Sequence, residues 1–190
     1  MKAETPTSRS SLAHRCSGYT LLELLAVVSI IGILSSMGVV SLQGAVANAR
    51  IKDAAYNVTA FMERTANEAR RLNTALCVKK AGDQKLVTFN KACGSDPAGD
   101  RIDSLLLDLP VKLIVDDVTG SDFEGKDNWA KATIGAEFKP KSGLSAAPTE
   151  GYMAVQYGGQ SLWGMAYKES TKNFFVPKVK YSGESPWTDL

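Results

Sequence analysis

The sequence predicts an α+β fold, in which a long N-terminal helix with a transmembrane first half packs on a C-terminal antiparallel β-sheet head. Three observations predict it. Residues 19–42 are almost entirely apolar, a helical spacing of apolar residues continues to residue 76, and short alternations with a period of two follow. The chain therefore divides into residues 1–18, 19–42, 43–73 and 74–190, and the last part is long enough for one domain with a modest core.

The first helical part has the length and composition of a membrane span. From Tyr19 to Leu42 there are 24 residues with one charged side chain, the carboxylate of Glu23. As a helix this segment is roughly 36 Å long, and a bilayer core is about 30 Å thick. A carboxylate in such a segment is costly, by about 2.5–3.5 kcal/mol at mid-membrane, so we expect Glu23 to have a neutralising partner. The excess of basic residues in 1–18 favours a cytoplasmic location for that end.

The residues around this carboxylate resemble a known processing signal. The run Ser17-Gly18-Tyr19-Thr20-Leu21-Leu22-Glu23-Leu24-Leu25, followed by apolar residues, is similar to the prepilin leader of type IV pilins and type II secretion pseudopilins. The resemblance implies cleavage by a prepilin peptidase between Gly18 and Tyr19, N-methylation of Tyr19, and a role of Glu23 in assembly. A plain single-span anchor and a secretory signal cut near Ala47 or Ala49 are the alternatives.

Charge and composition limit the chemistry of the mature chain. The leader holds three of the 22 basic and one of the 20 acidic residues, so 19 of each remain and the mature chain is formally neutral. We therefore do not expect nucleic acid as a partner. The single histidine, His14, lies in the leader, which excludes histidine acid–base catalysis and histidine-ligated zinc from the mature chain. We expect no enzyme activity, no cofactor and no metal.

The helix is predicted to continue well beyond the apolar segment. Apolar and small residues recur at spacings of four and three on one face: Ile51, Ala55, Val58, Met62, Thr65, Ala69, Leu72 and Leu76. Proline is absent between Tyr19 and Asn73, and Asn73 tolerates the left-handed conformation that ends a helix. The sequence thus predicts one helix over about residues 19–73.

Short strands are predicted in the remainder. They are expected at Thr74–Val78, Lys85–Asn90, Leu105–Leu109, Val111–Val115, Ala130–Lys139, Gly151–Tyr157, Ser161–Tyr167 and Asn173–Lys180. Two segments rich in Asp, Gly and Ser, Gly94–Asp103 and Thr119–Asn128, are expected to be surface loops. Together these predict one antiparallel sheet of about six to eight strands.

Two cysteines remain once Cys16 is lost with the leader. Cys77 and Cys93 would lie in the oxidising periplasm, where a disulfide between them would persist. Two buried free thiols are the alternative.

The head also resembles a particular group of minor pilins. The passage Glu68–Val78, in which an Ala-Arg helix end leads into a strand with a cysteine, is similar to the GspH/FimT type, as is the segment Phe138-Lys139-Pro140-Lys141-Ser142-Gly143. The resemblance implies a structural subunit of a type II secretion pseudopilus or a type IV pilus, acting in protein secretion or fibre initiation. Its partners would be other pilins, the prepilin peptidase, the assembly platform of the inner membrane and the lipid bilayer, with the head in the periplasm. A major pilin is the alternative within this class.

A binding role is the alternative from another class. Lys168, Lys172, Lys178 and Lys180, interleaved with aromatic residues, are candidates for a strip that holds DNA or polysaccharide. A solvated lysine face on an edge strand explains the same pattern, because such lysines discourage edge pairing. The end Pro177-Lys178-Val179-Lys180 also differs from the Gly-Arg-x-Arg ending of the DNA-uptake members that it resembles.

Overall fold

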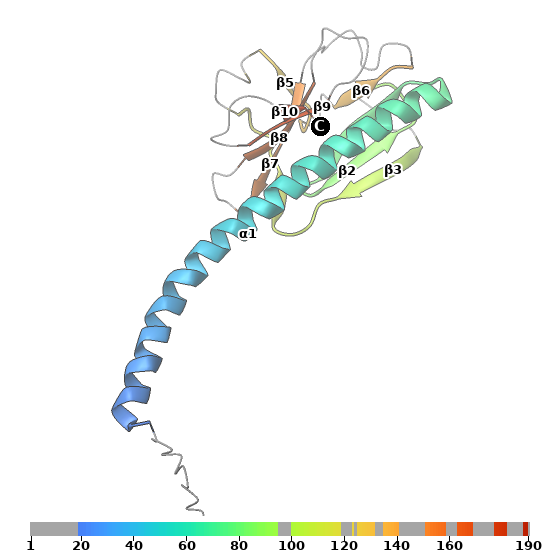
Figure 1. Ribbon diagram of the computed structural model, residues 1–190. Coiled ribbons are helices and arrows are strands. Elements are labelled where there is room, and N and C mark those ends of the chain that lie inside the picture. The colour runs from blue at the N-terminus through green and yellow to red at the C-terminus, as the bar shows by residue number, and fades with distance from the viewer. Residues whose placement is uncertain are drawn as a thin grey trace, which may run out of the picture. The chain divides into compact units, whose positions relative to one another are not determined.

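The computed structural model describes residues 19–94, 100–118, 123, 125–131, 135–140, 151–158, 163–168, 177–181 and 188–189. One helix is followed by short strands (Figure 1). They are α1 (Leu21–Leu72), β1 (Leu76–Gly82), β2 (Lys85–Phe89), β3 (Arg101–Leu106), β4 (Val111–Leu113), β5 (Asp127–Asn128), β6 (Ala136–Phe138), β7 (Gly151–Tyr157), β8 (Trp163–Lys168), β9 (Pro177–Tyr181) and β10 (Thr188–Asp189). The chain forms two compact units, Met1–Gln43 and Gly44–Leu190. The α+β prediction is confirmed.

The C-terminal end of α1 follows from the residue at its boundary. Asn73 has a φ of 50°, and the backbone N–H of Thr74 donates to the carbonyl of Ala69 at 3.2 Å. This is the bond by which a left-handed residue closes the last turn of a helix. The basic residues Arg70 and Arg71 of that turn favour the negative end of the helix dipole. The predicted stop at Asn73 is confirmed.

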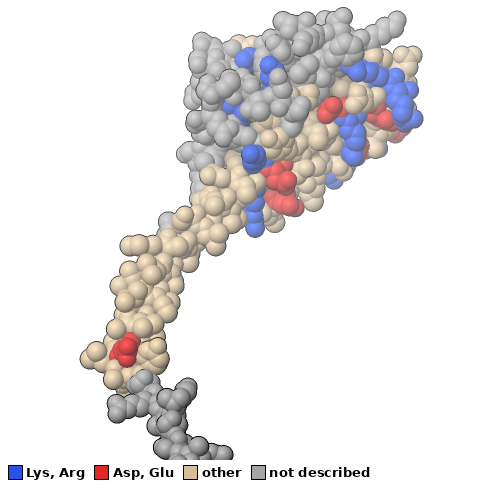
Figure 2. All heavy atoms as spheres, in the orientation of Figure 1, with Lys and Arg blue, Asp and Glu red and all other residues tan. Residues whose placement is uncertain are grey.

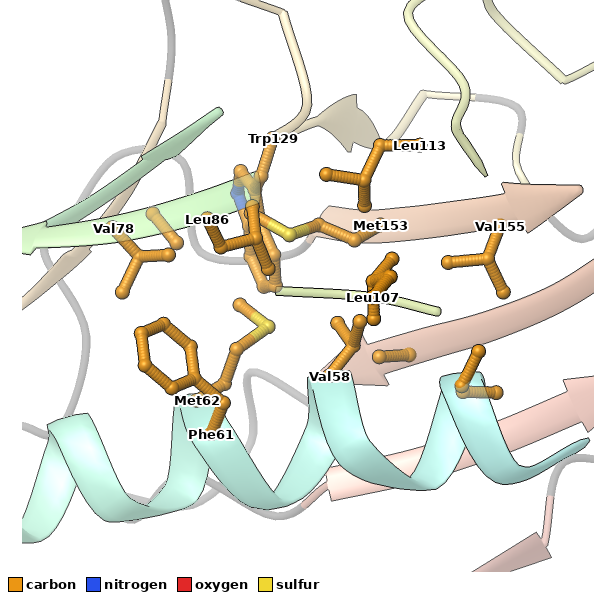
Figure 3. Packing of buried hydrophobic residues seen from close by; sticks show 14 of the residues in the cluster. Val58, Phe61, Met62, Val78, Leu86, Leu107, Leu113, Trp129, Met153 and Val155 are labelled. Atoms are coloured by element: carbon orange, nitrogen blue, oxygen red, sulfur yellow. The ribbon is translucent and has the colours of Figure 1, made fainter. Parts of the chain in front are cut away.

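The second half of α1 supplies one wall of the core. Its predicted apolar face is buried from Ile51 to Ala69, whereas Leu72 is 39% exposed. Figure 3 shows Phe61 and Met62 projecting from α1 toward Val78 and Leu86 of the sheet. Burying a side chain of this size stabilises the fold by about 1.5–3 kcal/mol. The face therefore packs on the strands of the same chain up to its last turn.

The first sheet has the order β3-β2-β1-β6, with every pair antiparallel. Its edge strand corrects the sequence prediction, since Gly94–Asp103 was expected to be a loop and Leu105–Leu109 a strand, whereas β3 covers Arg101–Leu106. Among the described strands, β3 pairs with β2 alone, and none of its residues is fully buried. The strand therefore lacks the apolar alternation that would reveal it. An ion pair between Arg64 and Asp103 joins it to α1.

The second sheet has the order β10-β9-β8-β7-β4, and β5 pairs with β7 in parallel. The prediction of a single antiparallel sheet is therefore wrong in two respects, the number of sheets and this parallel pair. Of the predicted strands, Gly151–Tyr157 has the predicted bounds, whereas the one expected at Ala130–Lys139 is confined to Ala136–Phe138.

The segment between β3 and β4 carries the chain from one sheet to the other. The backbone N–H of Leu107 donates to the carbonyl of Gln84 at 2.8 Å, and that of Leu113 to the carbonyl of Asp83 at 2.7 Å. Both leucines are buried in the core. The turn of the β1–β2 hairpin is thus fixed to the connection between the sheets, which leaves Asp108 and Leu109 at the surface.

Candidate membrane-spanning and assembly segment

Helix α1 begins with a side-chain cap. The backbone N–H of Glu23 donates to the hydroxyl oxygen of Thr20 at 3.2 Å and to its carbonyl oxygen at 3.1 Å. Thr20 therefore occupies the N-cap position and Glu23 the third position of the helix, the spacing of a capping box. Sequence reasoning missed this cap, although the Thr-x-x-Glu spacing is its signal. The cap thus fixes Thr20, the residue directly after Tyr19.

The apolar segment presents its side chains outward. The large apolar side chains that the structure describes between Leu21 and Leu42 are exposed, between 48% for Val27 and 83% for Leu21. Among the described residues, α1 is the helix long and apolar enough to cross a membrane. On the face seen in Figure 2 this segment carries one acidic group, near its start. Glu23 is the only Asp, Glu, Lys or Arg between Tyr19 and Ala49 in the sequence. A fully exposed apolar helix of this length needs lipid or other helices around it.

The hydroxyl groups of the segment are compatible with such surroundings. Ser29 donates to the carbonyl of Leu25 at 2.8 Å, and Ser36 to the carbonyl of Ile33 at 2.7 Å. These bonds satisfy the hydroxyl donors within the helix itself, as an apolar environment requires. Tyr19 is 78% exposed, directly before the cap. Gly18, the predicted cleavage residue, lies outside the described residues.

The two cysteines of the head are joined. Cys77 of β1 and Cys93 form a disulfide with a Cα–Cα distance of 5.1 Å. Two further bonds fix the same stretch: the backbone N–H of Cys93 donates to Glu137 Oε2 at 2.8 Å, and Lys79 Nζ donates to the carbonyl of Gly94 at 2.6 Å. The chain after β2 is therefore held against β1 and β6 at three points.

The candidate lysine strip is only partly assembled by the fold. Lys178 and Lys180 lie on β9, half-buried, two residues apart. Lys168 pairs in register with Pro177, the residue before Lys178. Paired positions belong to the same face of a sheet, so the position of Lys168 is on one face and those of Lys178 and Lys180 are on the other. Lys172 lies outside the described residues. Strand β9 runs between β8 and β10, so the expectation of an edge strand is wrong.

Charged groups elsewhere on the head form exposed pairs. Arg71 donates to Glu68 at 2.8 Å and lowers the pKa of that carboxyl, and Lys80 does the same to Asp83 at 3.0 Å. A hydrogen bond from Lys131 to Asp117 at 2.7 Å raises the pKa of the lysine. Within the described part of the chain, no group of three or more His, Cys, Asp or Glu residues is placed to hold a metal ion. These pairs are those of a solvated surface.

Comparison with known proteins identifies the N-terminal segment. The prokaryotic N-terminal methylation motif matches residues 13–39, which include the cap, Glu23 and most of the exposed apolar surface. No curated protein and no solved structure gives a significant match to the chain. The motif is typical of type IV pilins and pseudopilins, so the predicted pilin-type N-terminus is confirmed.

Proposed function

We propose that this protein is a minor pilin or pseudopilin of the GspH/FimT type, a structural subunit of a type II secretion pseudopilus or a type IV pilus. The observation that carries the proposal is the methylation motif on residues 13–39, because it coincides with a capped helix whose apolar side chains are exposed. A soluble enzyme has no use for such a helix. A fibre subunit needs it twice, in the bilayer before assembly and against other subunits afterwards.

Each site residue acts at one step between processing of the precursor and assembly of the fibre. The prepilin peptidase cuts after Gly18 on the cytoplasmic side of the bacterial inner membrane, and Tyr19 becomes the methylated terminus. The bilayer holds the apolar half of α1 until the assembly platform transfers the subunit to the fibre, with the head in the periplasm. Glu23, at the third helical position, then needs a positive partner, and the terminal amine of an adjacent subunit supplies one.

Processing tests the proposal directly. Glycine has no side chain to obstruct a peptidase subsite, so Gly18→Val should leave an uncut precursor in the inner membrane, whereas Ser17→Ala should be cut normally. Mass spectrometry of the native protein should find a chain that begins at Tyr19 and carries one methyl group. A chain that begins near Ala47 or Ala49 would instead establish a secretory signal.

A second function is not proposed. The binding alternative depends on lysines that act together, and the register sets Lys168 apart from Lys178 and Lys180. The neutral balance of charge in the mature chain also gives no long-range attraction for nucleic acid.

A further inference from the structure

A pocket of about 360 Å³ lies between α1 and the segment that joins β3 to β4. Its lining residues are Arg50, Asp53, Ala54, Asn57, Leu106, Leu107, Asp108, Leu109 and Val111. We call it the Arg50 pocket. It combines one guanidinium with two carboxylates and an apolar rim, and a cavity of this volume is sufficient for a small ligand.

The rim of the pocket carries the most exposed large apolar side chains described in the head. Leu106 is 70% and Leu109 74% exposed, whereas the other exposed ones from Leu72 onward are near 40%. Leu106 ends β3, and Leu109 lies on the connection to β4 next to the polar Asp108. Both leucines line the same pocket, and clustered exposed apolar residues mark surfaces that contact a partner or a membrane.

Arg50 ties this rim to α1. Its Nη1 donates to the carbonyl of Leu109 at 3.5 Å, and its Cζ lies 5.9 Å from the centroid of the Tyr157 ring. Leu109 is therefore held beside Arg50, at the same position along the axis of α1.

The length of the uncharged segment before Arg50 can be compared with the thickness of a bilayer. Arg50 is the first charged residue after Glu23, since Leu24–Ala49 contains no Asp, Glu, Lys or Arg. As a helix this uncharged segment is roughly 39 Å long. A bilayer with its headgroup layers is about 40–45 Å thick. The uncharged segment is thus long enough to cross the hydrocarbon core of such a bilayer, and Arg50, which directly follows it, is the first cationic side chain able to pair with a headgroup phosphate at its end.

We propose that the Arg50 pocket binds a phospholipid headgroup of the periplasmic leaflet while Leu106 and Leu109 insert into that leaflet. The lipid phosphate pairs with Arg50, and the primary ammonium of an ethanolamine headgroup pairs with Asp53 and Asp108. This contact rests on the proposed function, because it requires the anchored subunit. It holds the head against the membrane before assembly, and extraction into a fibre breaks it.

The site of photocrosslinking distinguishes lipid from other occupants. A benzophenone amino acid replaces Leu109 in the full chain, which is reconstituted in phosphatidylethanolamine vesicles with a minor fraction of phosphatidylglycerol. Irradiation should give an adduct with the mass of one phospholipid. The same probe at Asn67, an exposed position of α1 that is 17 residues after Arg50, should give no lipid adduct. A covalent dimer of the chain from position 109 would show that a second copy occupies the pocket, and would overturn the proposal.

A third probe position separates this inference from the proposed function. The benzophenone at Ile33 reports on the span, so lipid adducts at Ile33 without any at Leu109 would overturn only the pocket. Absence of adducts at both positions would overturn membrane anchoring as well. Arg50→Ala should lower the adduct yield at 109 severalfold and Arg50→Lys should restore most of it. Replacing phosphatidylethanolamine by phosphatidylcholine, whose ammonium has no N–H to donate, should also lower the yield. Equal yields in the two lipids would overturn the ethanolamine assignment.

Discussion

Gly164 of β8 lies directly against Ala55 of α1. A Cβ at Gly164 would be 2.9 Å from the Cβ of Ala55, 3.0 Å from the carbonyl oxygen of Ile51 and 3.2 Å from Val155 Cγ2. The helix and the second sheet therefore meet at a spacing that only glycine permits, and the contact includes the helix backbone, which cannot rotate away. This contact fixes the position of the second half of α1 on its own head.

Adding one methyl group at this contact should destabilise the head. We expect Gly164→Ala to cost about 1–3 kcal/mol, because overpacking forces the helix or the strand to shift. Gly82→Ala is the matched control, since the nearest atom to its new Cβ would be 3.9 Å away. Urea unfolding of the purified chain in detergent, followed by near-UV circular dichroism, measures both.

Removing the methyl group of Ala55 tests whether Ala55 and Gly164 together limit the distance between the helix and the sheet. Ala55→Gly alone should cost about 1 kcal/mol of helix propensity, but it should relieve Gly164→Ala when the two are combined. A double-mutant cycle with no coupling energy would show that the two residues do not limit the spacing.

The link between Cys77 and Cys93 should contribute more stability than any surface pair. The two residues are 16 apart in sequence, and closing a loop of that length is worth about 3 kcal/mol in the chain-entropy model. Reductant should therefore lower the unfolding free energy by about this amount, and it should leave a Cys77→Ser/Cys93→Ser chain unchanged. Two free thiols in the unreduced, unfolded protein would contradict the bridge.

How far the sequence predicted the fold depends on which interactions are local. The helix was predicted over residues 19–73 and is observed over Leu21–Leu72, because its apolar period, its missing prolines and the stop at Asn73 are all local signals. Strand β7 is buried along most of its length and has the predicted bounds.

The sheets could not be predicted in the same way. None of the residues of β3 is fully buried, and they show no apolar alternation, so the strand is recognisable only by its pairing with β2. The division into two sheets is set by the connection between β3 and β4, and the parallel β5–β7 pair has only two residues in each strand to signal it. In the candidate site, the residues proposed for processing and assembly were suggested by resemblance to a leader motif. The Arg50 pocket joins Arg50 of α1 to a segment more than 50 residues away and has no sequence signature.

Tyr152 should make the head sensitive to alkaline pH. It is 1% exposed, packs against Phe123 with ring centroids 5.2 Å apart, and accepts a hydrogen bond from the backbone N–H of Val118 at 3.1 Å. Burial raises its pKa above the ordinary 10.0, because the phenolate would lose its hydration. The folded state thus holds the proton more tightly than the unfolded state, so stability is fully present below pH 10 and falls as pH rises above it.

Tyr152→Phe isolates this effect from other titrations at high pH. The variant should lose about 1 kcal/mol at neutral pH, because the N–H of Val118 loses its partner, but its melting temperature should fall less between pH 9 and 11. The hydrogen bond to Asp117, which raises the pKa of Lys131 most, is kept in both proteins. Parallel curves for the two chains would show that Tyr152 contributes nothing to alkaline unfolding.

Glu23 should matter for assembly through its charge and not through its position in the helix. In an apolar surround its carboxylate costs about 2.5–3.5 kcal/mol, and an amine at about 4 Å returns roughly 4 kcal/mol at an effective dielectric of 20. The two nearly cancel, so the pair would set the register between subunits more than it would hold them together. Glu23→Gln and Glu23→Leu should both be cut after Gly18 and reach the membrane, but enter fibres poorly.

The cap at Thr20 provides the control that separates charge from helix structure. The bond to Thr20 uses the backbone N–H of Glu23, so Glu23→Gln removes the charge and keeps the cap. Thr20→Val removes the cap and keeps the charge, at a cost of about 1 kcal/mol to the helix start. Quantitative immunoblotting of sheared fibres should therefore find Thr20→Val near the native level and Glu23→Gln far below it. If Glu23→Leu assembles as well as the native chain, the carboxylate does not direct docking, and the N-terminal amine of the neighbouring subunit has no partner at this position.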